Sequence, residues 1–356
     1  MAYRLKLREG LHKGIRRIGL EQIERVEAHL RAEQDVATAV HDARRCLKRL
    51  RALLLLVRPA LEADLYRKET RRLAQVGRML AGARDRFVMC QSLAGIEKAA
   101  GPLPGDCGPL LQALITQGHD LAAPPEPGLR HEALVKLGAS RKFFSGRALH
   151  DVSMTDVWEG LEAAHRKGRH AFRACYRKPD DEAVHAWRKA VQRHWRHMAL
   201  VSRAWPQETA ARIAEAKMLS QILGEDHDLA VLAALASRHR EQLPEEGVAI
   251  LIQHAKGRQK DLRALARLHG DRLYAEPPED LVERLAGYWE ATRSLHKFES
   301  AAPAEAEPQA PESRGSPTPL QDVASAADGS QAPRATATES SVRRLPPRGA
   351  RKRARA

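Results

Sequence analysis

Cysteine and aromatic residues are scarce in this chain of 356 residues, and each scarcity excludes a class of protein. The four cysteines are widely spaced and form no CxxC pair, which argues against a disulfide scaffold and favours a reducing compartment. Aromatic residues make up 4% of the sequence, which argues against a protein that stacks unpaired bases on aromatic rings. A ligand recognised through phosphate is therefore favoured over one recognised through its bases.

Long apolar segments are also absent. The N-terminal segment MAYRLKLREG lacks the apolar stretch of a secretion signal. Apolar runs such as Ala52 to Val57 are far shorter than the roughly 20 residues that cross a bilayer as a helix. We therefore expect a cytoplasmic protein with no membrane insertion.

Acidic residues are fewer than basic residues in this chain. The formal net charge of the chain is +15, and residues 1–300 carry +12 of it. Because the excess belongs mainly to the region expected to fold, it favours a polyanionic partner. Nucleic acid, a phosphate polymer and an anionic membrane surface all meet this description.

Strand patterns are missing as well, since apolar residues recur at helical spacing from Leu7 to about Phe298. The sequence predicts an all-α fold with Gly and Pro in the loops. The expected helices span residues 8–33, 36–57, 61–82, 85–99, 109–121, 130–144, 154–177, 181–204, 207–223, 227–241, 245–268 and 278–297.

The last part of the chain, residues 301–356, has almost no large apolar residues and predicts a disordered tail. The tail ends in a cluster of arginines that would attract other polyanions nonspecifically, although a merely solubilising tail is the alternative interpretation. We expect one helical domain over residues 1–300, followed by this tail.

An internal repeat is the strongest positive signal. VHDARRCLKRLRALLLLV from Val40 and VHAWRKAVQRHWRHMALV from Val184 each begin with Val-His and place Arg three residues after the His. LAGARDRFVM around Asp85 likewise resembles LGEDHDLAVL around Asp228, and both lie at nearly the same distance from the preceding His. The pattern predicts two copies of one helical unit, over about 8–145 and 153–297, related by a pseudo-twofold axis.

The first copy has a sharply two-sided helix. His41, Arg44, Lys48 and Arg51 fall within an arc of roughly 80° on a helix that turns about 100° per residue. Arg offers phosphate two parallel hydrogen bonds and stays charged, whereas His gains charge only in mild acid. A phosphate-binding surface is one interpretation, and an ordinary solvated helix face is the other.

Five ordered segments resemble the CHAD family, the conserved histidine α-helical domain, across roughly residues 8 to 297. The segments are GLHKGIRRIGLEQIERV from Gly10, VHDARRCLKRLRALLLLVRP from Val40, LAGARDRFVM from Leu80, AAHRKGRHAFRACYRKPDDEAVHAWRKAVQRHWRHMALV from Ala163 and LSQILGEDHDLAVL from Leu219. The resemblance implies two four-helix bundles related by pseudo-twofold symmetry. It also implies a shared basic cavity that binds inorganic polyphosphate, and association with cytoplasmic polyphosphate granules.

The resemblance carries binding residues over unevenly between the two copies. In the second copy Gln192 stands where the family pattern usually has Lys, and Arg196 stands where Tyr is common. Arg16 and Arg17 of the first helix resemble further phosphate contacts. The complete expected binding set is His41, Arg44, Lys48, Arg49, Arg51, His185, Arg188, Lys189, Arg193, Arg196, Arg16, Arg17, Arg166, Lys167, Arg169 and Arg173.

Two other functions stay open. An enzyme acting on phosphate polymers is one, but the chain lacks the ExExK motif of the triphosphate tunnel domains that sometimes accompany CHAD modules, and it lacks a P-loop. A nucleic-acid-binding protein is the other, without a helix-turn-helix or zinc-finger signature. We expect a non-enzymatic binding protein without a cofactor.

Some polar residues are expected to serve the fold instead. His194 lies on the apolar face of its helix and predicts a hydrogen-bonded core histidine. His194 and His197 have a spacing that metal sites use, but no further ligands complete a set, so no metal site is expected. Asp85 and Asp228 each follow a glycine and are expected to cap new helices.

Overall fold

The computed structural model describes residues 3–32, 36–80, 82–117 and 127–301, and the regular structure within these ranges is entirely helical. The all-α prediction is confirmed. The tail expected over 301–356 lies outside the described residues except for Ala301. Eleven α-helices are described: α1 (Leu11–Arg31), α2 (Val36–Leu56), α3 (Ala63–Met79), α4 (Gly82–Ala100), α5 (Cys107–Thr116), α6 (Pro127–Ser145), α7 (Met154–Arg177), α8 (Asp181–Leu200), α9 (Pro206–Arg238), α10 (Glu245–Leu273) and α11 (Pro278–Ala301).

Local sequence explains several helix boundaries. Ser153 begins α7 with a capping box, because its hydroxyl accepts from the Asp156 backbone while that carboxylate accepts from the Ser153 N–H. The Asp180 carboxylate caps α8 by accepting from the Ala183 N–H at 2.7 Å. Proline occupies the first turn of α9, where a backbone donor is not needed.

The expected break near Gly224 is wrong. The segments predicted as 207–223 and 227–241 form the single helix α9, so Asp228 lies inside a helix and caps nothing. A Cβ added to Gly224 would lie 3.2 Å from Nη2 of Arg188, so glycine leaves room there for a guanidinium. Asp85 lies in the first turn of α4, which begins at Gly82, and it is not the cap either.

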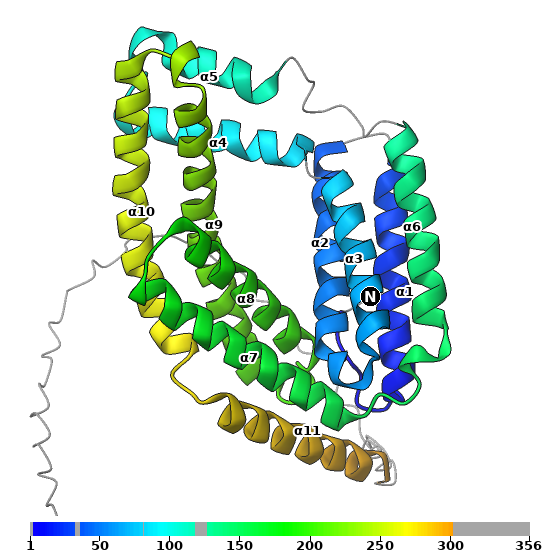
Figure 1. Cartoon of the computed structure of the whole chain (residues 1–356). Coiled ribbons are helices and arrows are strands. Elements are labelled where there is room, and N and C mark those ends of the chain that lie inside the picture. Colours follow the sequence, from blue (N-terminus) through cyan, green and yellow to red (C-terminus); the bar gives the residue numbers. More distant parts are fainter. Residues whose placement is uncertain (1–2, 33–35, 81, 118–126, 302–356) are drawn as a thin grey trace, which may run out of the picture. The chain divides into compact units, whose positions relative to one another are not determined.

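Two apolar clusters form the interior. The first joins α1, α2, α3 and α6 with the beginning of α7 and with α11, through residues such as Ile18, Leu50, Leu73 and Leu285. The second joins α4, α5, α9 and α10 with the other parts of α7 and α8. Figure 1 shows α4 and α5 beside the upper ends of α9 and α10.

The two clusters do not follow the boundaries of the sequence repeats. Helices α4 and α5 come from the first repeat but pack in the second cluster, while α11 comes from the second repeat and packs in the first. Helices α7 and α8 contribute to both, since Trp187 is buried in one cluster and Met198 in the other. These two helices therefore join the clusters into one body.

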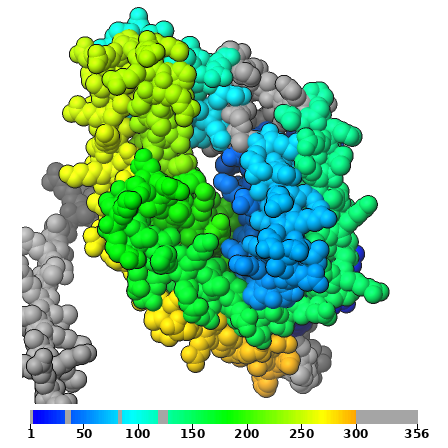
Figure 2. Space-filling model, viewed as in Figure 1, coloured from blue at the N-terminus to red at the C-terminus, as the bar shows by residue number. Residues whose placement is uncertain are grey.

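Helices α2, α4, α8 and α9 surround a common space. Helix α2 contacts α4 and α8, and α9 contacts the same two helices, so the four contacts close a ring (Figure 1). The surface is hollowed between the blue segment of α2 and the green segments of α8 and α9 (Figure 2). Within the described residues, no helix is both long and apolar enough to cross a membrane.

Candidate functional site

The ring of helices encloses a cleft with a volume of about 1310 Å³. Residues from α3, α7, α10 and the short 3-10 helix Arg58–Ala60 complete its lining. Helix α2 presents to it the polar side opposite Ala43, Leu47, Leu50 and Leu54, which are buried in the first cluster. The hydrophobic face of α2 thus fixes the direction in which its basic stripe points.

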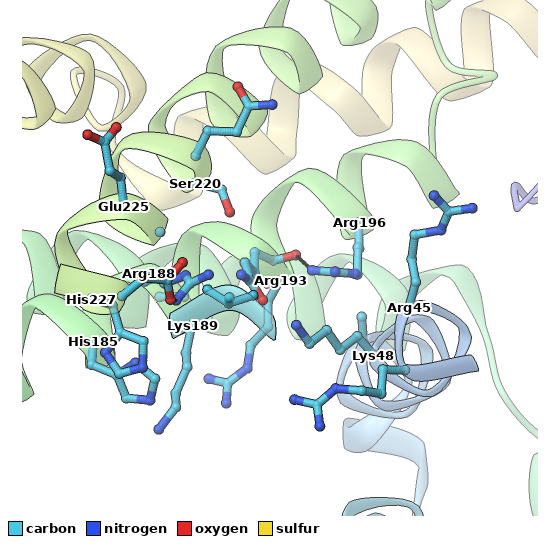
Figure 3. A pocket seen from close by; sticks show the side chains of 18 of the residues that line it. Arg45, Lys48, His185, Arg188, Lys189, Arg193, Arg196, Ser220, Glu225 and His227 are labelled. Atoms are coloured by element: carbon cyan, nitrogen blue, oxygen red, sulfur yellow. Dashed lines mark hydrogen bonds and ion pairs between the residues drawn. The ribbon is translucent and has the colours of Figure 1, made fainter. Parts of the chain in front are cut away.

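The cleft is strongly cationic. Its lysines and arginines are Arg44, Arg45, Lys48, Arg51, Arg58, Lys167, Arg188, Lys189, Arg193, Arg196 and Arg258. Against these eleven side chains stand three carboxylates, those of Asp85, Glu225 and Asp228, which leaves a formal excess of eight positive charges. Figure 3 shows Lys48 of α2 facing the region occupied by Lys189, Arg193 and Arg196 of α8.

Each of the three carboxylates already has an arginine partner. Arg44 donates from Nη2 to Oδ1 of Asp85 at 3.3 Å, and Nη1 of Arg188 lies 3.6 Å from Oδ1 of Asp228. Arg258 lies on α10 and donates to Glu225 at 2.6 Å. The first two pairs link the same repeat positions in both halves of the chain.

Other cations of the cleft have no carboxylate partner. Within the part of the chain that the structure describes, no ion pair is formed by Lys48, Arg51, Lys189, Arg193 or Arg196. These five side chains come from α2 and α8, two helices that contact each other. In the free protein, solvent and salt ions therefore take the place of an ion-pair partner for these five charges.

The pKa values record this crowding. Burial, followed by the charges of Arg196, Arg188 and Arg44, lowers the pKa of Lys48 to about 8. The Lys48 side chain is exposed to water, but the protein walls of the cleft lie around it. These walls replace part of the water that would stabilise the charged ammonium. Burial also lowers the pKa of Arg193, with a contribution from the charge of Arg51.

Arg196 occupies a special position. Its side chain is 5% exposed, lines the cleft, stacks with its guanidinium carbon 4.2 Å from the ring centroid of Trp195 and donates to the backbone oxygen of Gln192. Burial lowers its pKa to about 10, so it remains cationic at neutral pH. Gln192 lines the cleft as well, and Arg196 supplies a charge one turn away from it.

Two histidines stack at one end of the cleft. The ring of His185 lies 4.0 Å from that of His227, with an angle of 21° between the planes. Burial and nearby cations lower the pKa of each to about 4, so both rings are neutral at pH 7. His41 lines the same cleft from α2.

Several donors of the cleft are shielded from solvent and have no hydrogen-bond partner in the protein. They include Nε of Arg188 and Nε of Arg196, while Nδ1 of His185 is likewise buried without a partner. Buried polar groups are normally satisfied, and these three atoms belong to side chains that line the cleft. An anion with several acceptor oxygens would match the two guanidinium donors.

Ten of the sixteen expected residues line this cleft, namely His41, Arg44, Lys48, Arg51, Lys167, His185, Arg188, Lys189, Arg193 and Arg196. The structure thus brings both copies of the basic helix to one place. Sequence reasoning missed Arg45, Arg58, His227, His254 and Arg258. Of these, His254 and Arg258 carried a usable signal, since they lie four residues apart on one face of α10.

The other six expected residues lie outside the cleft. Arg17 is held by Glu9 at 2.8 Å and also contacts Glu21, and Arg166 pairs with Glu162. Arg49 donates to Gln22 at 3.4 Å and lies over the ring of Tyr3. Arg16, Arg169 and Arg173 are likewise not among the lining residues.

Two histidines of the second basic helix, His194 and His197, lie in the core, as expected for His194. His194 is 2% exposed and accepts from Nε of Arg212 at 3.3 Å. His197 is fully buried, and its Nε2 lies 2.9 Å from the backbone oxygen of Ala52. Among the described residues, no group of three or more His, Cys, Asp or Glu could hold a metal ion.

Comparison with known proteins identifies the family of this chain. The family model of the CHAD domain matches residues 17–237, which is more than half of the chain. The chain belongs to the CHAD domain family. No curated protein matched the sequence.

Two solved structures are similar to this chain. The crystal structure of the CHAD domain from the plant Ricinus communis is similar with a TM-score of 0.56 and 21% identity, covering 77% of this chain and 94% of that one. PptA from Streptomyces chartreusis has a TM-score of 0.45 and 14% identity, covering 74% of this chain and 98% of that one. At such identities the likeness to the plant CHAD domain supports the fold alone.

Proposed function

We propose that this CHAD protein binds inorganic polyphosphate in the cleft between α2 and α8, without chemical turnover, and associates with polyphosphate granules. The observation that carries the proposal is the group of five cations, Lys48, Arg51, Lys189, Arg193 and Arg196, which share one cleft without carboxylate partners. The association of the CHAD family with polyphosphate supports the same ligand.

A phosphate polymer suits this cleft better than a single phosphate does. An excess of eight positive charges is more than one phosphate can neutralise. A polymer carries a charge on every unit and can contact the basic helices of both repeats at once. Arg provides paired donors and Lys a mobile point charge for its oxygens, and binding releases condensed counterions.

The absence of turnover is part of the proposal. Among the described residues, no three or more His, Cys, Asp or Glu side chains come together as a metal site, so the carboxylates of the cleft are poorly placed to hold a catalytic magnesium ion. Incubation with polyphosphate and Mg²⁺ should release no phosphate above the background of a heat-denatured sample. Sustained, protein-dependent release would contradict this part of the proposal.

A pair of double variants tests the binding site. Lys189→Ala with Arg193→Ala removes two cleft cations, whereas Arg16→Ala with Arg173→Ala removes two exposed charges outside it. Titration with long-chain polyphosphate should show a loss of affinity of about tenfold or more for the first, because charged hydrogen bonds are lost. The second should stay within about twofold of the wild type.

The same titrations, repeated at several salt concentrations, also measure how the affinity for polyphosphate depends on salt. Each lost phosphate contact should reduce the slope of log K against log salt by about one unit, so the cleft variant should have a shallower slope by about two units. Equal losses in both double variants would indicate nonspecific attraction to the whole surface. Displacement of polyphosphate by duplex DNA at matched phosphate concentration would favour nucleic acid as the ligand.

A further inference from the structure

Two arginines of the cleft differ from their neighbours because a carboxylate holds each of them. Arg44 contacts Asp85 of α4, and Arg188 contacts Asp228 of α9. The arrangement occurs once in each repeat. A carboxylate in a cleft that attracts phosphate is electrostatically unfavourable for the ligand, so its recurrence calls for an explanation.

The geometry of these pairs is that of exchangeable contacts. The nitrogen–oxygen distances are 3.3 Å for Arg44 and 3.6 Å for Arg188, the carboxylates are 59% and 30% exposed, and the arginines are 22% and 21% exposed. Partly exposed pairs at such distances contribute little to stability in water. A multiply charged phosphate that offers several oxygens can therefore replace the carboxylate as the partner of the guanidinium.

Ion pairs that support the fold of this protein look different. Arg263 of α10 contacts both carboxylate oxygens of Asp226, the nearer at 2.7 Å, and that Asp side chain is 2% exposed. Arg284 holds Glu276 through two bonds of 2.8 Å and also pairs with Glu208. The pairs at Arg44 and Arg188 lack this closeness and enclosure.

Other neighbours of the two cleft arginines do not involve the carboxylates. Nη1 of Arg44 lies 3.4 Å from the backbone oxygen of Gly77, to which it donates. The guanidinium of Arg188 lies against Gly224, where a Cβ would be 3.2 Å from Nη2. Both side chains line the cleft, where a ligand can reach them.

We infer that Asp85 and Asp228 are affinity-limiting residues, which occupy Arg44 and Arg188 in the free protein and must be displaced when a phosphate chain binds. The inference rests on the proposed function and assigns to it a pair of residues that oppose binding. In the free protein the two carboxylates relieve repulsion among the cations. When the chain leaves, they recapture the arginines and shorten the lifetime of the complex.

Neutral amide variants test the inference with long-chain polyphosphate as the probe. Asp85→Asn and Asp228→Asn should each raise the affinity by about threefold, and the double variant by about tenfold, as expected for removal of weak competing pairs. The gain should appear mainly as slower dissociation. The slope of log K against log salt should become steeper by one to two units, roughly, because two more cations exchange counterions for phosphate.

Controls separate this effect from a general change of charge. Asp64→Asn with Glu290→Gln removes two exposed carboxylates of ion pairs on α3 and α11, outside the cleft, and should leave affinity within about twofold.

The experiment distinguishes failure of this inference from failure of the proposed function. Unchanged or weaker binding by the double amide variant, beside a wild type that binds, would overturn the inference and make the carboxylates positioning residues. An equal gain in the control variant would also overturn it. Failure of the wild-type protein to bind polyphosphate would instead refute the proposed function.

Discussion

The ring of His185 lies face to face with that of His227, with centroids 4.0 Å apart, on the wall of a cleft that also holds Lys189 and Arg188. Burial, together with the neighbouring cations, disfavours a proton on either ring and lowers both pKa values to about 4 in the free protein. The negative charge of a polyanion in the cleft would offset the positive charge of these cations. We therefore expect the histidine pair to couple ligand binding to protonation.

Binding of polyphosphate should be accompanied by proton uptake. Because the ligand raises the two depressed pKa values, the complex holds more protons than the free protein, and affinity should increase as the pH falls from 7 toward 5. Calorimetry in buffers of different ionisation enthalpy measures the uptake directly. In His185→Asn with His227→Asn the uptake measured between pH 5 and 6, where Lys48 is already protonated, should decrease; an undiminished uptake would exclude the pair as its source.

Lys48 should make the affinity for polyphosphate decline at alkaline pH. Its pKa of about 8 in the free protein means that the ammonium loses its proton above that pH, so affinity should decline between pH 7 and 9. Lys48→Arg keeps the positive charge throughout this range and should flatten the decline. Fluorescence or calorimetric titration at several pH values checks this, and identical pH profiles for both proteins would contradict it.

Stability should fall in mild acid because of the buried histidines. Burial lowers the pKa of His165 and of His197 to about 4, whereas the unfolded chain titrates near 6.5. The unfolded state therefore binds protons first, so stability is complete above pH 6.5 and is lost as the pH falls toward 4. The loss should reach about 3 kcal/mol per histidine at most, since each pKa unit corresponds to 1.36 kcal/mol.

A single variant isolates one of these histidines. His197→Gln retains a side-chain donor for the Ala52 oxygen but has no proton to gain. The urea midpoint of this variant should depend less steeply on pH between 6.5 and 4.5 than that of the wild type. A pH dependence equal to that of the wild type would assign the acid sensitivity to other groups.

Local chemistry made much of the fold and the cleft predictable from sequence. The stripe His41, Arg44, Lys48 and Arg51 could be recognised because α2 buries its opposite face, and that face fixes where the basic residues point. The repeat predicted that the second copy would have the same helix. All four residues of the stripe, and their counterparts His185 and Arg188, line one cleft.

Other features depend on tertiary packing and could not be predicted locally. Gly224 resembled a helix end, yet it serves the close approach of Arg188 to α9. Arg16 and Arg17 share a basic segment with the family pattern, but Glu9 and Glu21 engage Arg17 through contacts that depend on the fold. The exchange of α4 and α5 into the second apolar cluster is likewise set by packing between distant segments.

The junction of α7 with α2 provides a stability test at the base of the cleft. Gly160 of α7 is buried where the two helices touch, and a Cβ there would lie 1.9 Å from the backbone oxygen of Leu56. Because that atom belongs to the main chain of α2, it cannot rotate away as a side chain would. Gly160→Ala should therefore push α7 from α2 and destabilise the protein by about 3 kcal/mol.

A second glycine supplies the matched control. A Cβ at Gly287, exposed in α11, would meet nothing within 4 Å, so Gly287→Ala should be neutral or stabilising by up to about 1 kcal/mol. Urea unfolding of both variants measures the difference. Equal stability of the two would mean that α7 and α2 are not pressed together at Gly160, and the packing that aligns the basic stripe of α2 with α8 would need another origin.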